Sequence, residues 1–201
     1  MLPVIWFTGL SGAGKSTLCR AVESELQLCR IPTSVLDGDI IRQSLSKDLG
    51  YSPEDRVENL RRVSRLAKQV NQDGFLVLIA AISPYETTRA EIRKEHACFL
   101  EVFVNAPLEI CESRDPKGLY RQARAGLIAH FTGISAPYEI PSNPDIECKT
   151  SQETIQVSCG KVLAAIEPFV SDLAARDIRA FQRALNKSRI ASNVETGAFK
   201  P

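Results

Sequence analysis

The stretch GLSGAGKST, residues 9–17, decides the fold of this chain. It follows the apolar run VIWF and fits the pattern G-x-x-x-x-G-K-[ST]. The fixed positions of the pattern are Gly9, Gly14, Lys15 and Ser16. In such loops the glycines turn backbone N–H groups toward phosphate oxygens, the lysine reaches the terminal phosphates, and the hydroxyl ligates Mg²⁺. We therefore predict a nucleoside triphosphate site.

The residues after this loop extend the site into a helix. Residues 16–27, STLCRAVESELQ, predict a helix whose N-terminus favours an anion. The residues expected to bind the nucleotide in this region are Gly9, Ser11, Gly12, Ala13, Gly14, Lys15, Ser16 and Thr17.

Apolar runs alternate with longer helical segments along the rest of the chain. The predicted strands lie at residues 4–9, 33–38, 75–82, 99–104 and, more weakly, 145–150. The intervening segments are long enough for crossover helices, which is typical of a parallel sheet covered on both faces. We predict an α/β fold, a P-loop NTPase-type doubly wound parallel sheet of about five strands with helices on both faces.

The composition limits the possible partners and compartments. The 201 residues suit one domain. The 25 Lys+Arg against 24 Asp+Glu give a net charge of only +1, so we expect neither nucleic acid nor a membrane as a partner. Six scattered cysteines form no C-x-x-C pair, so we expect reduced thiols. With no basic leader and no apolar run near the ~20 residues that cross a bilayer, we expect a soluble cytoplasmic protein.

The predicted domain covers residues 1–170 and has two irregular parts. Residues 114–144 collect Gly, Pro, charged and aromatic residues, and such a stretch is often a functional lid, or else an ordinary surface excursion. Residues 171–201 predict a C-terminal helix followed by a disordered tail. The apolar side chains that recur at helical spacing in it are Ile178, Phe181 and Leu185. This helix could dock, form a dimer contact or be solvated.

Several absences narrow the class of nucleotide-binding protein. A GTPase would carry N-K-x-D, but the one Asn-Lys pair, at Asn186, lies in the tail and lacks the aspartate. Motor-type ATPases place an acid at the end of an apolar strand, yet the apolar run at residues 75–82 is followed by Ser83 and Pro84. The strand that ends on acids is SVLDGD, with Asp37 and Asp39.

This acid pair lies where phosphoryl transfer requires carboxylates. Ligands of an open α/β sheet bind beyond the carboxyl ends of the strands, so Asp37 and Asp39 should face the phosphates, and Gly38 should let the backbone turn between them. Transfer needs a carboxylate toward the attacking hydroxyl and a magnesium ion on the departing phosphates. A simple turn is the alternative interpretation of Asp-Gly-Asp.

The helix predicted from Ser52 supplies candidate handles for an acceptor. Its buried stripe is Leu60, Val63, Ala67 and Val70, and Arg56 and Asn59 continue that stripe toward the helix start. With Arg42 they could hold an anion by forked hydrogen bonds, or Arg42 and Arg56 could form surface salt bridges. Tyr51 and Phe131 could sandwich a planar base, or be core residues.

At this point the sequence resembles one family, the adenylylsulfate (APS) kinases. The matching strings are WFTGLSGAGKST, LDGDIIR, DLGYSPEDRVENLRR, ISPY, FVNAPLEICESRDPKGLYRQARAG and FTGISAPYE, in the family's order. The resemblance implies transfer of the γ-phosphoryl of ATP to the 3'-hydroxyl of adenylyl sulfate, with Mg²⁺, to give 3'-phosphoadenylyl sulfate (PAPS) and ADP in sulfate assimilation. It also implies a homodimer.

The resemblance further implies a role for each matched residue. The residues that would hold adenylyl sulfate are Arg42, Arg56 and Asn59, with Tyr51 and Phe131 around its adenine and Lys117 at the acceptor or the transferring phosphate. Arg114 would lie near the ATP base. Asp39 would take the hydroxyl proton and Asp37 would organise magnesium or water, although these two roles could be exchanged.

Ser83 matches a serine described in the family as a phosphorylated intermediate. The chain has two histidines and neither lies beside Ser83 in sequence, so no activating base is evident. We expect direct in-line transfer, with Ser83 positioning the acceptor or capping the next helix. Two other functions stay open, a P-loop kinase of another small anionic acceptor and a non-catalytic ATP-binding regulatory subunit.

Overall fold

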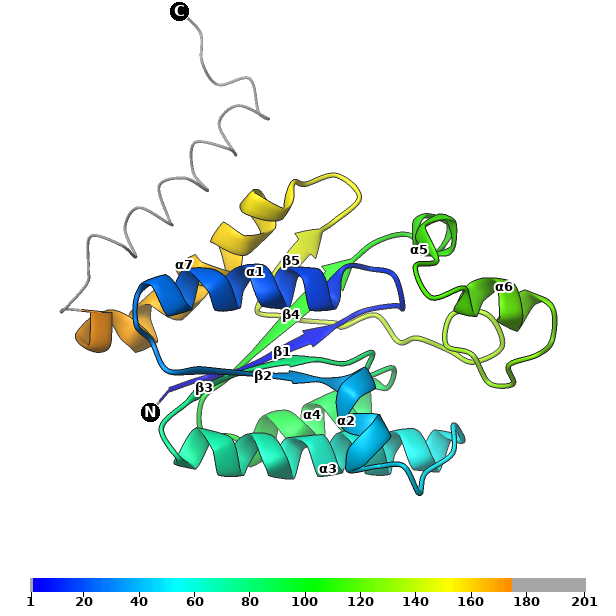
Figure 1. Ribbon diagram of the computed structural model, residues 1–201, viewed down its shortest axis with the longest axis horizontal. Helices are drawn as coiled ribbons and strands as arrows, with labels where there is room; N and C mark the ends of the chain where they lie inside the picture. Colours follow the sequence, from blue (N-terminus) through cyan, green and yellow to red (C-terminus); the bar gives the residue numbers. More distant parts are fainter. Residues whose placement is uncertain (1, 175–201) are drawn as a thin grey trace, which may run out of the picture.

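A computed structural model describes residues 2–174 of the chain (Figure 1). Its centre is a five-stranded parallel sheet in the order β2-β3-β1-β4-β5. The strands are β1 (Val4–Thr8), β2 (Thr33–Asp37), β3 (Leu76–Ala80), β4 (Phe99–Asn105) and β5 (Ile146–Lys149). All five predicted strands are thereby confirmed, with ends that differ by a few residues.

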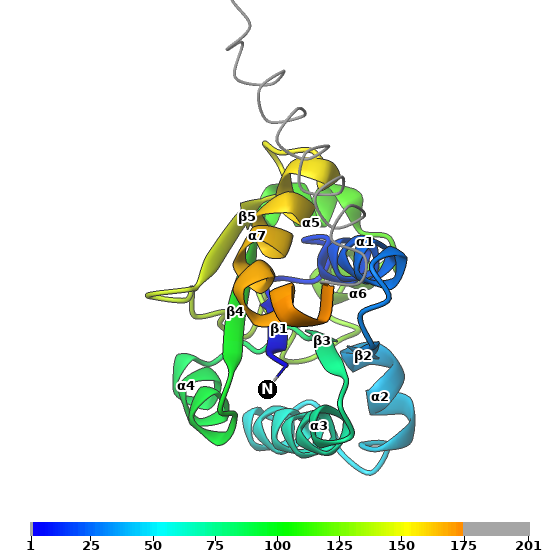
Figure 2. The same cartoon turned by 90° about the vertical axis from the view of Figure 1, so that its left-hand side faces the viewer.

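Helices cover both faces of the sheet, as predicted. They are α1 (Lys15–Leu28), α2 (Gly38–Ser44), α3 (Pro53–Gln72), α4 (Glu86–Glu95), α5 (Leu108–Arg114), α6 (Leu119–Arg124) and α7 (Ile155–Ala174). Helices α1 and α7 pack together on one face, and α3 and α4 pack together on the other (Figure 2).

Strand β1 forms the middle of the core because both of its faces are covered. Successive side chains of a strand point to opposite faces. Ile5 and Phe7 accordingly join the core under α1 and α7, whereas Val4 and Trp6 join the core under α3. All five residues of β1 are buried, so the apolar run before the glycine loop fixes that loop at the sheet's carboxyl edge.

The helix predicted from Ser52 is α3. Ser52 is its N-cap, with a side chain that accepts a hydrogen bond from the Asp55 N–H at 3.1 Å, and Pro53 occupies the first turn. Such a cap satisfies a backbone donor that the helix itself leaves free. The predicted stripe is buried at Leu60, Val63 and Ala67 but only partly buried at Val70, so the opposite face of α3 is left to charged residues.

The chain beyond residue 170 was predicted to form a separate C-terminal helix. In the structure, α7 runs through Pro168 and continues to Ala174. The predicted apolar positions Ile178, Phe181 and Leu185 lie outside the described residues. Within residues 2–174, no helix combines the length and the apolar character needed to cross a membrane.

Candidate active site

The glycine loop joins β1 to α1 through three glycines with positive φ, at 150° for Gly9, 74° for Gly12 and 103° for Gly14. A Cβ at Gly9 would lie 2.4 Å from the carbonyl oxygen of Val104, and one at Gly12 would lie 2.8 Å from that of Cys111. The loop is therefore seated against β4 and α5 so closely that a side chain would displace it. Loops of this pattern turn backbone N–H groups toward phosphate oxygens.

Lys15 folds over this loop. Its Nζ donates hydrogen bonds to the carbonyl oxygens of Gly9, at 2.9 Å, and Leu10, at 2.8 Å. Burial lowers the pKa of Lys15 to about 8, although the nearby Asp39 carboxylate acts in the opposite direction. An anion above the loop would favour the charged amine, so the site is suited to bind phosphate.

Asp37, the last residue of β2, connects the loop to the acid pair. Its Oδ2 accepts a hydrogen bond from Ser16 Oγ at 2.7 Å, and its Oδ1 accepts one from the Asp39 N–H at 2.9 Å. The second contact makes Asp37 the N-cap of α2. Ser16 and Asp37 offer the hard oxygen donors that Mg²⁺ prefers, and Mg²⁺ usually completes its shell with water and phosphate.

Gly38 serves a different purpose from the one the sequence suggested. We expected it to supply a turn between the two acids, but it is the first residue of α2 and its φ lies outside the left-handed region. A Cβ there would lie 3.0 Å from the carbonyl oxygen of Ala80. Glycine therefore lets the start of α2 approach the end of β3.

One cavity, of about 420 Å³, lies on the α1 side of the loop. It is lined by Gly12, Gly14, Lys15, Ser16, Thr17, Leu18, Arg114, Pro116, Thr150, Glu153, Ile155 and Ser158. Arg114 lies at its edge, where Nη2 donates to the Thr150 carbonyl oxygen at 2.7 Å and Nη1 donates to that of Gly12 at 3.2 Å. Arg114, which we predicted to bind the nucleotide, thus contacts the loop although it lies 102 residues from Gly12 in the sequence.

A second cavity, of about 300 Å³, lies on the α3 side and contains the other predicted residues. Those that line it are Lys15, Asp39, Arg42, Tyr51, Arg56, Asn59, Ser83, Lys117 and Phe131. They come from the loop, α2, α3, the end of β3 and the 114–144 segment. The two cavities share Gly12 and Lys15, so a group bound in each would meet at the loop.

This arrangement agrees with what is known of similar proteins. The family model of adenylylsulphate kinase matches residues 2–149. The chain is 54% identical over 162 residues to an adenylyl-sulfate kinase of Synechococcus sp. (strain JA-3-3Ab), an alignment that covers 81% of this chain and 92% of the relative. The chain belongs to the adenylyl-sulfate kinase family.

Solved structures extend the likeness to the fold of these kinases. The Mycobacterium tuberculosis APS kinase CysC, in complex with AMPPNP and APS, shares 48% identity and a TM-score of 0.80, over 83% of this chain and 98% of that one. A hexameric APS kinase from Thiobacillus denitrificans shares 30% identity and a TM-score of 0.60, over 82% of this chain and 28% of that one.

Two arginines of this family member flank Tyr51 at the mouth of the second cavity. The guanidinium carbon of Arg42 lies 4.2 Å from the centroid of the Tyr51 ring, and that of Arg56 lies 5.8 Å away. Arg42 also donates to the Gly50 carbonyl oxygen, and Arg56 Nη2 donates to that of His130 at 2.5 Å. These contacts hold two cations side by side, so they can receive an anion.

Asn59 and Phe131 lie deeper in the same cavity. Asn59 is 7% exposed, and its Oδ1 accepts no hydrogen bond from any residue between 2 and 174. Phe131 packs edge-on against Tyr120, with ring centroids 5.0 Å apart. The cavity thus offers the unused Asn59 acceptor and an anchored aromatic ring.

Lys117 and Asp39 form an ion pair across this cavity. Asp39 lies in the first turn of α2, and Lys117 lies in the 114–144 segment just before α6. Both side chains are more than half exposed, so the pair is weak and can be exchanged for a ligand. The family resemblance implied a role for both residues at the reacting groups, and the structure brings them together.

Ser83 lies in the wall of the cavity in a fixed conformation. It is 1% exposed, its φ is 50°, and its Oγ accepts a hydrogen bond from Trp6 Nε1 at 2.7 Å. Positive φ is uncommon for a residue other than glycine and persists only where the surroundings impose it. Ser83 therefore shapes the cavity from within the core, and it does not cap α4, whose N-cap is Tyr85.

Two residues that support the loop were missed from the sequence. Tyr120 is buried, and its hydroxyl donates to the Ser11 carbonyl oxygen at 2.9 Å. Thr150 Oγ1 donates to the Ala13 carbonyl oxygen at 2.7 Å. Neither stands in a pattern of its own, because each acts through a backbone oxygen more than a hundred residues away. The one sequence signal for Tyr120 was that it lies in DPKGLY, residues 115–120, a part of the strings that resemble the family.

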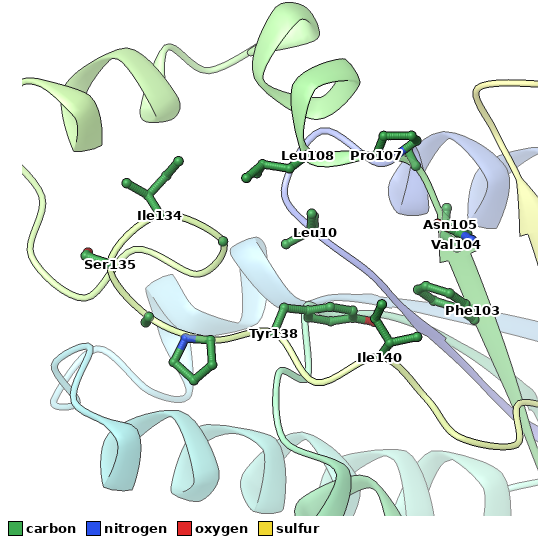
Figure 3. Close-up of a pocket in the computed structure, with 14 residues that line it drawn as sticks. Leu10, Phe103, Val104, Asn105, Pro107, Leu108, Ile134, Ser135, Tyr138 and Ile140 are labelled. Carbon is green, nitrogen blue, oxygen red and sulfur yellow. The ribbon is translucent and has the colours of Figure 1, made fainter.

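A third cavity, of about 630 Å³, lies beside the active site and contains none of the predicted residues. Figure 3 shows Ile134 and Leu108 at one end, Phe103 and Ile140 at the other, and Leu10 of the glycine loop between them. The lining is mostly apolar and carries no charged side chain. Its walls include Leu10 of the glycine loop and several residues of the 114–144 segment, which therefore lie on either side of it.

Proposed function

We propose that the chain transfers the γ-phosphoryl of MgATP to the 3'-hydroxyl of adenylyl sulfate, giving 3'-phosphoadenylyl sulfate and ADP. The observation that carries this proposal is the second cavity, where two arginines and an asparagine lie next to the Lys15 amine and the Asp39 carboxylate. A nucleotide with an anionic tail and a free hydroxyl matches these groups. The family membership points to the same acceptor.

On the nucleotide side, Lys15 and the loop N–H groups would bind the phosphates, and Arg114 would lie at the ATP base. Ser16 and Asp37 would hold Mg²⁺, which supplies charge neutralisation on the phosphates when it is bound. The Ser16–Asp37 hydrogen bond supports this assignment, because the hydroxyl proton is engaged by Asp37 and the oxygen lone pairs stay free for a cation.

On the acceptor side, Arg42, Arg56 and Asn59 would bind the phosphosulfate and ribose, and Tyr51 and Phe131 would flank the adenine. Lys117 would move from Asp39 to the transferring phosphate. Asp39 would then accept the proton of the 3'-hydroxyl. The hydroxyl oxygen would form the new bond to the γ-phosphorus as the bond between that phosphorus and ADP breaks. Ser83 would shape the pocket and not carry the phosphoryl group.

The decisive experiment is an incubation with MgATP and adenylyl sulfate, with the phosphorylated nucleotide measured by chromatography. Asp39→Asn should lower kcat by about 10²–10⁴ while ADP affinity is kept, as expected for loss of a general base. Asp37→Asn should instead raise the Mg²⁺ concentration needed for activity. Asp73→Asn, at the exposed C-cap of α3, is the matched control.

Two outcomes separate the remaining alternatives. Absence of product with adenylyl sulfate, together with turnover of another hydroxylated anion in a substrate panel, would favour a different P-loop kinase. ATP binding without turnover of any acceptor would favour the regulatory subunit. We also propose that the protein is cytoplasmic and forms a homodimer. Light scattering of the purified protein would test the dimer.

A further inference from the structure

A buried arginine outside the active site connects two of its walls. Arg89, on α4, is 3% exposed. Its Nη1 donates to the Ser83 carbonyl oxygen at 2.6 Å, and its Nη2 donates to the Glu139 carbonyl oxygen at 2.7 Å. Nη2 also pairs with the Glu86 carboxylate, and Nε lies 2.9 Å from Glu101 Oε1. The contact of Nε with Glu101 is an ion pair without hydrogen-bond geometry, so this guanidinium donates hydrogen bonds through its two Nη atoms.

The two carbonyl oxygens belong to segments that the chain separates widely. Ser83 lies in the acceptor wall after β3, and Glu139 lies near the end of the 114–144 segment. Further contacts join the same two segments. The Glu139 N–H donates to the Pro84 carbonyl oxygen at 2.8 Å, and the Glu86 N–H donates to Glu139 Oε2 at 2.6 Å. The 114–144 segment is thus anchored to the acceptor wall at this point.

The neighbour Tyr138 strengthens the anchor. Its ring lies beneath the Arg89 guanidinium, at 5.8 Å from centroid to Cζ, and stacks on Phe103 at 6.2 Å. Its hydroxyl lies 3.0 Å from Thr8 Oγ1, at the end of β1. The anchor therefore reaches the strand from which the glycine loop starts.

We propose that Arg89 is a positioning residue for the acceptor: by holding the carbonyls of Ser83 and Glu139 together, it fixes the acceptor wall and the 114–144 segment that bounds the same cavity. This inference rests on the proposed adenylyl-sulfate kinase activity. Arg89 does not line the cavity itself, so it acts through Ser83 and through the segment that carries Lys117 and Phe131.

The chemistry of the cluster requires arginine in particular. Two carbonyls and two carboxylates lie around one planar group, and guanidinium presents five donors in a fixed fork. Lysine would have three donors on a single point and could not reach all four partners. Burial raises the pKa of Glu101, and the nearby Arg89 and Arg93 cations act in the opposite direction.

The test compares Arg89→Lys with a matched control on the same helix, Arg93→Lys. Arg93 pairs with Glu101 at 3.5 Å and with Asp145 at 2.6 Å, but contacts neither Ser83 nor Glu139. We expect Arg89→Lys to raise KM for adenylyl sulfate by about tenfold, as for loss of one charged hydrogen bond, with KM for ATP unchanged. Arg93→Lys should change neither value.

Both values are measured in the full chain well below the unfolding midpoint of each variant. An unchanged KM for adenylyl sulfate in Arg89→Lys, or an equal rise in both KM values, would overturn the inference. If Arg89→Lys does not fold, Arg89→Met with Glu101→Leu removes both buried charges and should show the same selective rise; a wild-type KM would overturn the inference. Failure of the wild type to phosphorylate adenylyl sulfate would instead overturn the proposed function.

Discussion

Replacement of Ser83 by alanine tests the mechanism most directly, and its effect on stability follows from one hydrogen bond. The Trp6 N–H is buried and donates to Ser83 Oγ at 2.7 Å. Without the hydroxyl this donor has no partner, which costs about 1–3 kcal/mol of unfolding free energy. Ser83→Gly loses the same bond but relieves the positive φ, so it should be more stable than Ser83→Ala by about 1 kcal/mol. Urea unfolding measures both.

The same variant separates direct transfer from a phosphorylated enzyme. If the phosphoryl group passes directly from ATP to the acceptor, Ser83→Ala should keep turnover within about tenfold, because the residue only shapes the pocket. If Ser83 is a nucleophile, folded Ser83→Ala should lose turnover almost entirely. Mass spectrometry of the wild type after ATP alone would show a phosphoryl adduct on Ser83 in that case, and either result would refute direct transfer.

Three other predictions concern the glycine loop. Gly9→Ala should abolish ADP binding in calorimetry, because its Cβ would lie 2.4 Å from the Val104 carbonyl oxygen. Since burial lowers the pKa of Lys15 to about 8, its amine is charged below that pH and neutral above it, so ADP affinity should fall as pH rises through that value, and Lys15→Met should remove this dependence. Tyr120→Phe, which loses the 2.9 Å bond to Ser11, should raise KM for ATP more than KM for the acceptor and lower the unfolding free energy by about 1 kcal/mol.

The fold was predictable because its signals are local. An apolar run buried on both faces, followed by a glycine loop and a helix start, identifies a strand and its edge without knowledge of the rest of the chain. Asp37 was placed at the end of a strand for the same reason. The short helix α2 was not predicted, because Gly38 at its first turn looks like a turn residue until the close approach of Ala80 is seen.

The proposed acceptor cavity was predictable where helical spacing pointed to it. Arg56 and Asn59 continue the buried stripe of α3, so their direction followed from the period of a helix. Arg89 was missed, because its partners Ser83 and Glu139 lie six and fifty residues away and are backbone oxygens, which leave no trace in side-chain patterns.

The two cavities divide the chain in a way that matters for engineering. Most residues of the cavity on the α3 side come from one continuous piece, residues 38–84, whereas the cavity on the α1 side draws on residues 12–18, 114–116 and 150–158. A recombinant chain could therefore receive a different 38–84 piece from another protein of this fold and keep its own cavity on the α1 side. Such a graft would have to preserve the Arg89 contacts, which join Ser83 in this piece to Glu139 outside it.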